Sequence, residues 1–385
     1  MISWKEASRK VIDTLNNKGY EAYIVGGAVR DYLLNIPIKD IDICTNASIS
    51  KLKTLFPHHI DVGATHGTII VKVSDKTIEV SSFKSTNNSE IVTIEEDLFN
   101  RDFTINAMAM NETGKIIDPF GGQDDLKQKV LKVVGHSEER LLEDPLRLLR
   151  AIRFKLHYSL RVDRKTERWI NEHAGKINDV AVERISNEID KIASATLEKN
   201  QIIELLDSII IFELPHIFTN FEEFVEKLKS TSETIRTTNI EELWLIALLH
   251  TEDLSSVFTY YRRSNKFKRQ LSHIVTGIRR VIDRKWTKMD LYEIGETYIP
   301  LTEKIRAICK EEPAEIETIK TMYDALPIKN KEELAIGGED LMNWFPNEPG
   351  VWIGQCLQEI EKAVVNGDVE NNKEHIYHWL KEGGI

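Results

Sequence analysis

The sequence predicts an α+β fold, with a small mixed sheet in the first third of the chain and helices in the rest. Before about His136, short alternating or β-branched apolar runs are separated by glycines and polar turns, which is typical of strands. After it, apolar residues recur at spacings of three and four, which is typical of helices. At 385 residues the chain is long enough for about two or three domains.

The first third contains short elements in a regular order. Residues 5–18 predict an amphipathic helix, and residues 21–25 predict a strand that stops at the pair Gly26-Gly27. Residues 85–94 form a polar loop between the later strands and the next helix. The other predicted strands lie at residues 40–44, 67–73, 77–83, 107–110 and 115–117.

The remainder predicts one helix after another, without an internal repeat of fixed period. The expected helices lie at residues 140–156, 164–174, 182–194, 200–212, 221–229, 241–250, 265–284, 301–310 and 314–324. Pro327-Ile328, followed by the charged run 329–333, indicates a last boundary, after which a C-terminal unit begins.

The charge balance excludes a protein that coats nucleic acid indiscriminately, because the formal net charge is -11. Residues 261–285 are different, since their basic side chains face a single acid, Asp283. A nucleic-acid partner would have to use this basic segment, although a charge run of this kind can also be a solvated helix face. Its basic residues are Arg262, Arg263, Lys266, Lys268, Arg269, Arg279, Arg280, Arg284 and Lys285.

Targeting and cysteine patterns exclude further classes of protein. Charged residues follow Met1 within a few positions, so no secretory signal develops and we expect a cytoplasmic protein. The most apolar later stretch, residues 202–218, contains three acids and should not cross a membrane. The three cysteines are far apart, which excludes a disulfide framework and a local cysteine zinc site and favours buried, unpaired thiols.

The first chemical motif combines a glycine turn with two nearby aspartates. Gly26-Gly27 ends a strand, which lets the backbone approach a phosphate, and Arg30 follows in the next helix. Asp40 and Asp42 are one residue apart on a predicted strand, so both carboxylates would point the same way and could share divalent metal ions. Together they indicate metal-dependent nucleotidyl transfer rather than a solvated strand end. Glu79 is either a third carboxylate or an ordinary exposed strand residue.

A second motif, residues 101–107, begins with Arg101 and Asp102. The Arg101 guanidinium suits a triphosphate, because its fork binds two oxygens at once, and Asp102 could accept from a ribose hydroxyl. Each could equally belong to a surface ion pair. Residues 118–122 are expected to form a structural turn between the sheet and a helix, with a link to the active site as the less favoured alternative.

The third motif places Asp144, Arg147, Arg150 and Arg153 at steps of three along a predicted helix. A solvated face is one explanation, but nothing in the stripe neutralises the three arginines, whereas an anionic ligand would. An aspartate accepts hydrogen bonds and an arginine donates them, so the two side by side can recognise a base edge that has an amino group next to an acceptor. Cytosine and adenine both have such an edge.

With these motifs in this order, the whole chain resembles the bacterial class II tRNA nucleotidyltransferases, which build the CCA end of tRNA. The resemblance implies a polymerase-β-like head followed by a helical neck, body and tail. It implies that Asp40 and Asp42 hold catalytic Mg²⁺, that Gly27, Arg30 and Arg101 hold the triphosphate, and that Asp144 and Arg147 select the base. Arg150 and Arg153 would assist them.

The resemblance also implies domains and partners. The head would span residues 1–135, the neck 136–195, the body 196–326 and the tRNA-binding tail 327–385. Residues 183–188 match a helical motif that braces the neck, and residues 334–341 and 349–354 resemble the tail. The expected partners are tRNA, CTP and ATP, with no membrane.

This chain departs from the family pattern at three places. Asn100 precedes Arg101 where the family usually has arginine, and Pro145 stands where alanine is common, although proline suits a first helical turn capped by Asp144. Residues 85–94 are shorter than the flexible, arginine-containing loop of complete CCA-adding enzymes. In that family the loop is thought to act as a lever, and members without it add only the two cytidines. We therefore favour CC addition, with a separate A-adding enzyme, over complete CCA addition.

Three rivals remain at this stage. A bacterial poly(A) polymerase would have a similar head, but the motif at residues 143–147 favours tRNA. A non-catalytic tRNA-binding protein would not need Asp40 and Asp42. A fused phosphohydrolase is opposed by the sequence around His250 and Asp253, which lacks a His-Asp metal cluster.

Overall fold

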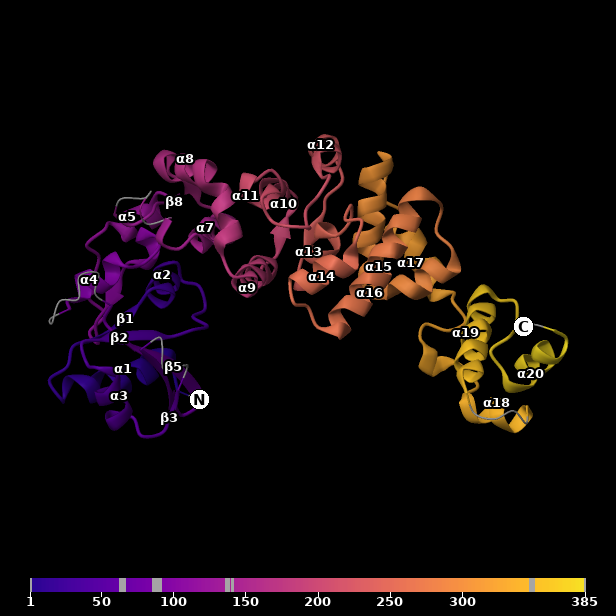
Figure 1. Ribbon diagram of the computed structural model, residues 1–385, viewed down its shortest axis with the longest axis horizontal. Helices are drawn as coiled ribbons and strands as arrows, with labels where there is room; N and C mark the ends of the chain where they lie inside the picture. Colours follow the sequence, from indigo (N-terminus) through magenta and orange to yellow (C-terminus); the bar gives the residue numbers. More distant parts are fainter. Residues whose placement is uncertain are drawn as a thin grey trace. The chain divides into compact units, whose positions relative to one another are not determined.

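The computed structural model describes residues 2–61, 67–84, 92–135, 139, 142–345 and 350–383. The chain forms two compact units, Met1–Val180 and Ala181–Ile385 (Figure 1). The boundary between them falls inside the range expected for the neck. The predicted boundaries at 135, 195 and 326 stay predictions, and residues 136–138 lie outside the described part.

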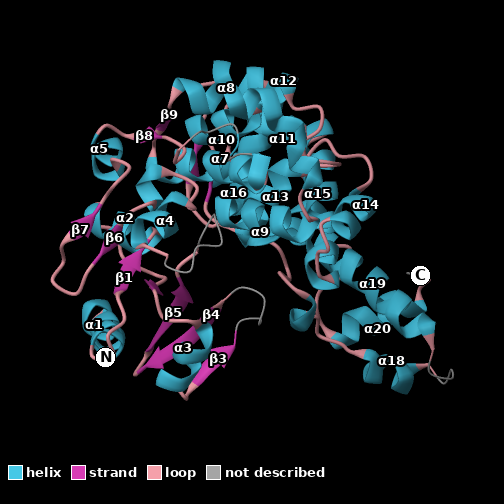
Figure 2. Ribbon diagram, turned by 60° about the vertical axis from the view of Figure 1, so that its left-hand side comes forward, coloured by secondary structure: helices cyan, strands magenta, loops and turns pink. Residues whose placement is uncertain are grey.

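The first unit contains the predicted mixed sheet, whose strands run in the order β3-β4-β5-β2-β1-β6-β7 (Figure 2). Strands β2 and β5 are parallel, and the other neighbours are antiparallel. The strands are β1 Ala22–Val25, β2 Asp42–Thr45, β3 His59–Asp61, β4 Thr68–Val73, β5 Lys76–Ser82, β6 Ala109–Met110 and β7 Ile116–Ile117. Strand β3 was not predicted, because its three residues are too few to show a period.

The helices of the first unit form where capping side chains and apolar spacing agree. Helix α1 begins after Ser3, whose hydroxyl accepts the backbone N–H of Glu6 at 3.1 Å, and buries Val11, Ile12 and Leu15 on one face. The others are α2 Gly27–Leu33, α3 Ile49–Leu55, α4 Ile94–Phe99, α5 Gly122–Lys127, α7 Leu146–Tyr158 and α8 Arg164–His173, with 3₁₀ turns Thr104–Asn106 and Ala174–Asp179. A short parallel pair, β8 Val130–Leu131 and β9 Arg161–Val162, joins the unit.

The second unit is helical, as predicted, apart from the short pair β10 Leu197–Glu198 and β11 Arg236–Thr237. Its helices are α9 Val182–Ala193, α10 Lys199–Leu206, α11 Ile209–Phe212, α12 Glu222–Ser230, α13 Ile240–Ala247, α14 Leu254–Tyr260, α15 Asn265–Asp283, α16 Lys288–Lys310, α17 Ile316–Asp324, α18 Gly338–Trp344, α19 Val351–Asn366 and α20 Lys373–Lys381, with a 3₁₀ turn at Lys331–Glu333. One apolar core joins α16 and α17 to α19 and α20 through Leu291, Ile319, Ile360 and Ile376.

Two helix predictions in this unit were wrong in extent. The helix expected over 200–212 is broken into α10 and α11, because the chain leaves helical geometry at Ser208. The helix expected over 301–310 is the end of the longer α16, which contains Pro300 and a kink at Gly295 (φ 73°). A glycine tolerates this positive φ, so the chain can change direction there without strain.

The remaining predictions concern membranes and thiols. No helix among the described residues is both long and apolar enough to span a membrane. Cys44 is buried, whereas Cys309 and Cys356 are only partly buried, so the expectation of buried cysteines holds for the first alone.

Candidate active site

Both the backbone geometry and the close packing of the turn after β1 require a glycine at position 26. Gly26 has φ 68° and ψ -129°, a conformation that residues with a side chain rarely adopt. A Cβ at this position would lie 2.6 Å from Nη1 of Arg101. The turn therefore brings the backbone at the start of α2 directly against the Arg101 guanidinium.

Arg30, on α2, is buried beside this turn with 6% of its surface exposed. Its Nη1 donates to Oδ1 of Asn106 at 2.6 Å, and its Nε donates to Oδ1 of Asp31 at 2.9 Å. A Cβ on Gly27 would lie 3.4 Å from Arg30 Nη2. The predicted phosphate ligands Gly27 and Arg30 are therefore neighbours in space, with the guanidinium held in place by protein acceptors.

Two of the predicted carboxylates, Asp42 and Glu79, lie side by side on the parallel strands β2 and β5. Asp42 is the first residue of β2 and pairs in register with Glu79 of β5. Burial, then the negative charge of Glu79, raises the pKa of Asp42 to about 6; Asp40 adds to the effect and Arg101 opposes it. Asp40 lies exposed before the strand begins, so the strand geometry expected for both aspartates applies to Asp42 only.

These carboxylates fit a divalent cation. Their oxygens are hard donors of the kind that Mg²⁺ prefers, and a cation would relieve the repulsion that raises the pKa of Asp42. Within the described ranges, no three His, Cys, Asp or Glu side chains are gathered as a complete metal cage. This arrangement agrees with sites in which Mg²⁺ is held by one or two carboxylates together with substrate phosphates.

Arg101 lies between the glycine turn and the carboxylates. Its Nη2 contacts Oδ2 of the buried Asp97 at 3.1 Å, and Asp97 also accepts the backbone N–H of Lys84 at 3.1 Å. Burial disfavours the charge of Arg101, but Asp97 and Asp42 outweigh it and raise the pKa of Arg101. Its Nε is buried without a hydrogen-bond partner among the described residues. Arg101 is thus a fixed cation next to Asp42.

Asp102 follows Arg101 in the chain, but its carboxylate points into the protein and is bound by protein donors. It is buried, and its carboxylate accepts from Arg150 Nε at 2.8 Å, from Asn106 Nδ2 at 3.0 Å and from the Phe103 amide at 2.8 Å. Burial would raise the pKa of Asp102, but Arg150 and these hydrogen bonds hold it below its usual value. Because protein donors surround this carboxylate, the ribose contact considered from the sequence does not fit this structure.

Helix α7 carries the third motif and packs its arginines toward residues 100–106. Arg147 Nη2 donates to the carbonyl of Asn100 at 3.1 Å, and its side chain is only 12% exposed. Arg150 binds Asp102, and the Arg153 guanidinium lies 4.1 Å from the centre of the Phe154 ring. The stripe is therefore not a solvated face, which was the alternative considered from the sequence.

The start of α7 follows the expected capping. Oδ1 of Asp144 accepts the backbone N–H of Leu146 at 3.3 Å, and Pro145 occupies the turn just before the first helical residue. The apolar face opposite the arginines is buried, as predicted, through Leu146, Leu149 and Ile152. Asp144 and Arg147 consequently lie within one helical turn of each other.

Three residues of this site were not singled out in the sequence. Asn106 bridges Arg30 and Asp102, and Phe154 and Tyr158 lie against Arg30. Asn106 lies inside the motif at 101–107, and the two aromatic residues are four apart on α7, so the spacing placed them on one face. Only the fold shows that this face meets α2.

The turn at residues 118–122 is structural, as expected. Oδ1 and Oδ2 of Asp118 accept the backbone N–H groups of Gly122 at 2.8 Å and Gln123 at 2.9 Å, which caps α5. A Cβ on Gly122 would lie 2.2 Å from the carbonyl oxygen of Thr104. The glycine therefore lets α5 pack against the motif that contains Arg101 and Asn106.

Four of the nine basic residues of the segment at 261–285 form ion pairs with acids of the second unit, among the residues that the structure describes. Arg263 forms a two-point ion pair with Asp190, and Arg284 forms one with Asp290. Arg262 pairs with Glu183, Arg280 pairs with Glu293, and Arg279 donates to backbone carbonyls at residues 248–251. In the part of the chain that the structure describes, the basic residues of the segment that form no ion pair are Lys266, Lys268, Arg269, Arg279 and Lys285.

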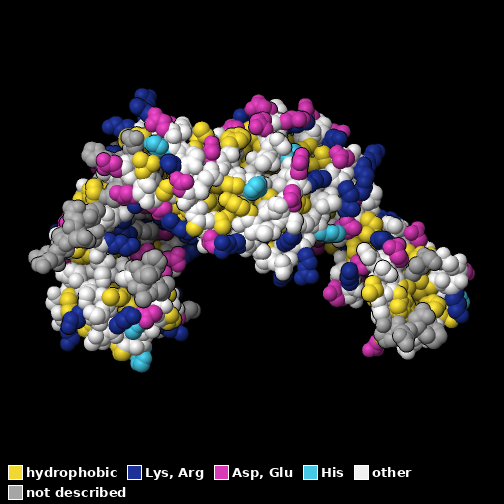
Figure 3. All heavy atoms as spheres, in the orientation of Figure 1, with side chains coloured by type: hydrophobic (Ala, Val, Ile, Leu, Met, Phe, Trp, Pro, Cys, Tyr) yellow, Lys and Arg dark blue, Asp and Glu magenta, His cyan; other side chains and the backbone are white. Residues whose placement is uncertain are grey.

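Helix α9, which carries the motif at 183–188, explains part of this neutralisation. Its Glu183 and Asp190 are the partners of Arg262 and Arg263, and its Ser186 donates to the carbonyl of Tyr261 at 3.2 Å. Figure 3 shows both basic and acidic side chains on the exposed face of the helices of this unit. The motif therefore anchors the start of the basic segment.

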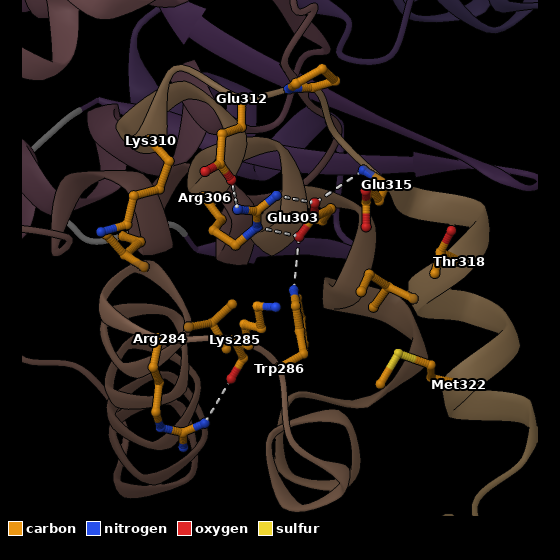
Figure 4. Close-up of a pocket in the computed structure, with 14 residues that line it drawn as sticks. Arg284, Lys285, Trp286, Glu303, Arg306, Lys310, Glu312, Glu315, Thr318 and Met322 are labelled. Carbon is orange, nitrogen blue, oxygen red and sulfur yellow. Dashed lines mark hydrogen bonds and ion pairs between the residues drawn. The ribbon is translucent and has the colours of Figure 1, made fainter.

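A cavity of about 520 Å³ lies in the second unit, between the end of α15, α16 and α17 (Figure 4). Its buried Glu303 accepts from Arg306 Nη2 at 2.8 Å and from Trp286 Nε1 at 2.7 Å. Burial would raise the pKa of Glu303, but Arg306 and the other donors lower it. The predicted site residues lie elsewhere, and the polar interior of this cavity is satisfied by the protein itself.

The fold and the site together define a nucleotidyltransferase: a small mixed sheet presents carboxylates beside a glycine turn and fixed arginines, and helices follow. Residues 22–132 match the family model of the poly A polymerase head domain, and residues 222–380 match that of tRNA nucleotidyltransferase domain 2. The chain is 33% identical to the CCA-adding enzyme of Bacillus cereus strain AH820, with 99% of each chain covered. The chain belongs to the CCA-adding enzyme family of tRNA nucleotidyltransferases.

Solved structures give the same result for the whole chain. The Bacillus stearothermophilus CCA-adding enzyme in complex with CTP has a TM-score of 0.79 and 33% identity, and covers 99% of this chain and 98% of its own. The Thermotoga maritima CCA-adding enzyme complexed with tRNA has a TM-score of 0.68 at 23% identity, covering 99% and 96%, and supports the fold alone. The predicted polymerase-β-like head and helical remainder are thus confirmed.

Proposed function

We propose that this chain adds the two cytidines of the CCA end to tRNA from CTP, leaving the terminal adenosine to a separate enzyme. The observation that carries this proposal is the short connection between β5 and α4. Strand β5 ends at Ser82 and α4 begins at Ile94, so eleven residues separate them. Ile94 belongs to the helix rather than to the predicted loop, and residues 85–91 lie outside the described part.

The length of this connection matters because one pair of side chains must serve bases of different size. Asp144 and Arg147 are held at the start of α7 by the backbone of Leu146 and Asn100, at 3.3 Å and 3.1 Å. To accept a purine after two pyrimidines, this pair would have to shift. A short connection without arginine between β5 and α4 provides no element that could move Asp144 and Arg147 by that amount.

The proposed reaction is an in-line displacement at the α-phosphorus of CTP. The 3′ hydroxyl oxygen of tRNA forms the new P–O bond, its proton is lost, and the bond to the bridging oxygen breaks to release pyrophosphate. Gly27, Arg30 and Arg101 would hold the triphosphate, and Asp144 and Arg147 would read the cytosine edge. Arg150 and Arg153 would support them, Arg150 through its ion pair with the buried Asp102.

Mg²⁺ is the proposed metal, held by Asp40 and Asp42, with Glu79 as a neighbouring carboxylate. When bound, it would supply a Lewis acid that neutralises charge on the phosphates. The charge effect of Glu79 on Asp42 supports this placement. Binding of Mn²⁺ as a spectroscopic probe, followed by electron paramagnetic resonance, should weaken in Asp42→Asn; unchanged affinity would place the metal elsewhere.

The proposal also divides the chain by task. Residues 1–135 would perform the transfer, 136–195 would select the nucleotide, 196–326 would form the body, and 327–385 would hold tRNA. The match of residues 222–380 to a tRNA nucleotidyltransferase model supports a role of the second unit in this activity. A cytoplasmic location is part of the proposal.

The decisive experiment compares two substrates. Purified protein receives a tRNA that lacks CCA, with CTP and ATP together, and separately a tRNA that already ends in CC, with ATP. We expect CC in the first reaction and no adenosine in the second, by sequencing of the 3′ ends. Replacement of residues 85–91 by a long family loop should restore adenosine addition.

Complete CCA addition is the second candidate. It is favoured by the relatives, since those with 33% identity over 99% of the chain are named CCA-adding enzymes. Efficient addition of adenosine to the CC-ending tRNA would establish this candidate and overturn CC addition.

A further inference from the structure

Two aromatic residues of α7, Phe154 and Tyr158, form a platform against Arg30 of α2. The Arg30 guanidinium carbon lies 4.4 Å from the centre of the Tyr158 ring and 5.3 Å from that of Phe154. The two rings are stacked, with centres 6.1 Å apart and 29° between their planes. A guanidinium over an aromatic face is attracted by the ring quadrupole and adopts a restricted orientation.

Tyr158 also holds the carboxylate that binds Arg30. Its hydroxyl donates to Oδ1 of Asp31 at 3.2 Å, and the same oxygen lies 2.8 Å from Arg30 Nη2 and accepts from Nε. The ring and the hydroxyl of one residue thus fix both members of the Arg30–Asp31 pair. Through this pair, Tyr158 of α7 contacts α2, the helix that follows the glycine turn.

The orientation of the Arg30 guanidinium determines which of its N–H donors can bind a ligand. An arginine has five N–H donors, and the contacts with Asp31 and Asn106 occupy one each on Nε, Nη1 and Nη2. No described residue accepts the second hydrogens of Nη1 and Nη2, the nitrogens that lie nearest to Gly27. A rotation of the guanidinium toward Asp31 would turn them away from the turn.

We infer that Tyr158, with Phe154, is a positioning residue that aims Arg30 at the nucleotide triphosphate and ties this contact to the base-reading helix. The inference rests on the proposed role of Arg30 in triphosphate binding. Arg147 lies in the first turn of helix α7, with Asp144 just before the helix, and the platform lies at the other end. Base recognition and triphosphate recognition therefore share one rigid element.

The test compares ligands with and without the β- and γ-phosphates. In Tyr158→Leu, equilibrium binding of CTP should weaken about tenfold, whereas binding of CMP should stay unchanged. Tyr158→Phe keeps the ring and should restore most of the CTP affinity. Tyr32→Leu is the matched control, since it removes a tyrosine from α2 that contacts Trp4 and Lys5 instead of Arg30.

A coupling measurement separates positioning from general damage. In an Arg30→Lys background the guanidinium is gone, so Tyr158→Leu should cause little additional loss of CTP affinity. Phe154→Leu provides a second probe of the platform if Tyr158→Leu does not fold, as judged by circular dichroism.

The possible outcomes are distinct. Unchanged CTP affinity in Tyr158→Leu, or an equal loss for CTP and CMP, would overturn the positioning role while the proposed function stands. An unmodified protein that binds CTP no better than CMP would contradict the proposed function, and the inference with it.

Discussion

The two arginine-rich helices of this protein use their charge differently. In α7, Arg147 and Arg150 turn toward residues 100–106, beside the predicted nucleotide ligands. In α15 and the residues on either side of it, Arg263, Arg280 and Arg284 form ion pairs with carboxylates of the same unit. Both regions have an excess of positive charge in the sequence, and acids of the protein pair with part of it in each, but only the arginines of α7 lie beside the predicted nucleotide ligands.

This difference shows that local net charge is a poor measure of available charge. The acids that neutralise the basic segment, Glu183, Asp190, Asp290 and Glu293, lie outside residues 261–285. They reach it only because α9 and α16 pack beside it. We therefore expect charge removal in the head to impair the reaction, and removal of the ion-paired arginines around α15 to reduce stability.

The largest effect should come from the head carboxylates. Asp42→Ala or Asp40→Ala should lower CMP incorporation more than about a hundredfold, because each removes a proposed metal ligand. Stability should be preserved, since Asp42 sits among repelling carboxylates. Single-turnover transfer to tRNA measures the loss, with Asp13→Ala on the surface of α1 as control. Near-normal transfer at saturating Mg²⁺ would refute the metal assignment.

The second-largest effect should be a loss of base selectivity when Arg147 or Asp144 is replaced. Arg147→Ala and Asp144→Ala should each reduce CMP transfer by roughly tenfold or more and permit measurable UMP or GMP incorporation, because the pocket no longer rejects the reversed donor pattern. Competition among the four triphosphates checks this, with Lys155→Ala on the same helix as control. If both variants keep the selectivity of the unmodified protein among the four triphosphates, base recognition lies elsewhere.

In the basic segment of the second unit, Arg263→Gln should reduce the free energy of unfolding. Arg263 pairs with the partly buried Asp190 and stacks 4.3 Å from the Trp244 ring centre, so its loss should cost about 2 kcal/mol. Chemical denaturation measures this cost, and Lys266→Gln, which removes an exposed charge from the same segment, should change stability by under about 0.5 kcal/mol. Equal stability of both variants would show that the ion pair is dispensable.

The smallest effect concerns tRNA binding by the cations that remain in the basic segment. Replacement of Lys266, Lys268 and Arg269 by Gln should weaken tRNA binding and reduce its salt dependence by about one unit of slope per lost phosphate contact. The arginines in ion pairs are left intact, so a loss of fold cannot imitate the result. An unaltered slope would return the segment to a solvated helix face.

The sequence alone determined those features that depend on near neighbours. The alternating and three-four apolar patterns gave the mixed sheet and the helices, and Gly26-Gly27 marked a turn that only glycine tolerates. The spacing of Asp144, Arg147, Arg150 and Arg153 defined one helix face before its contacts were known. The motifs also identified the family, because their order and residue types are those of the site.

The tertiary structure decided the contacts between elements, which local spacing does not encode. It placed Glu79 opposite Asp42 through the register of β2 and β5, and it buried Asp102 against Arg150. It also brought Tyr158 to Arg30, 128 positions away in the chain. These contacts depend on how helices and strands pack around a common core, and the free energy of that packing belongs to the whole unit rather than to any one segment.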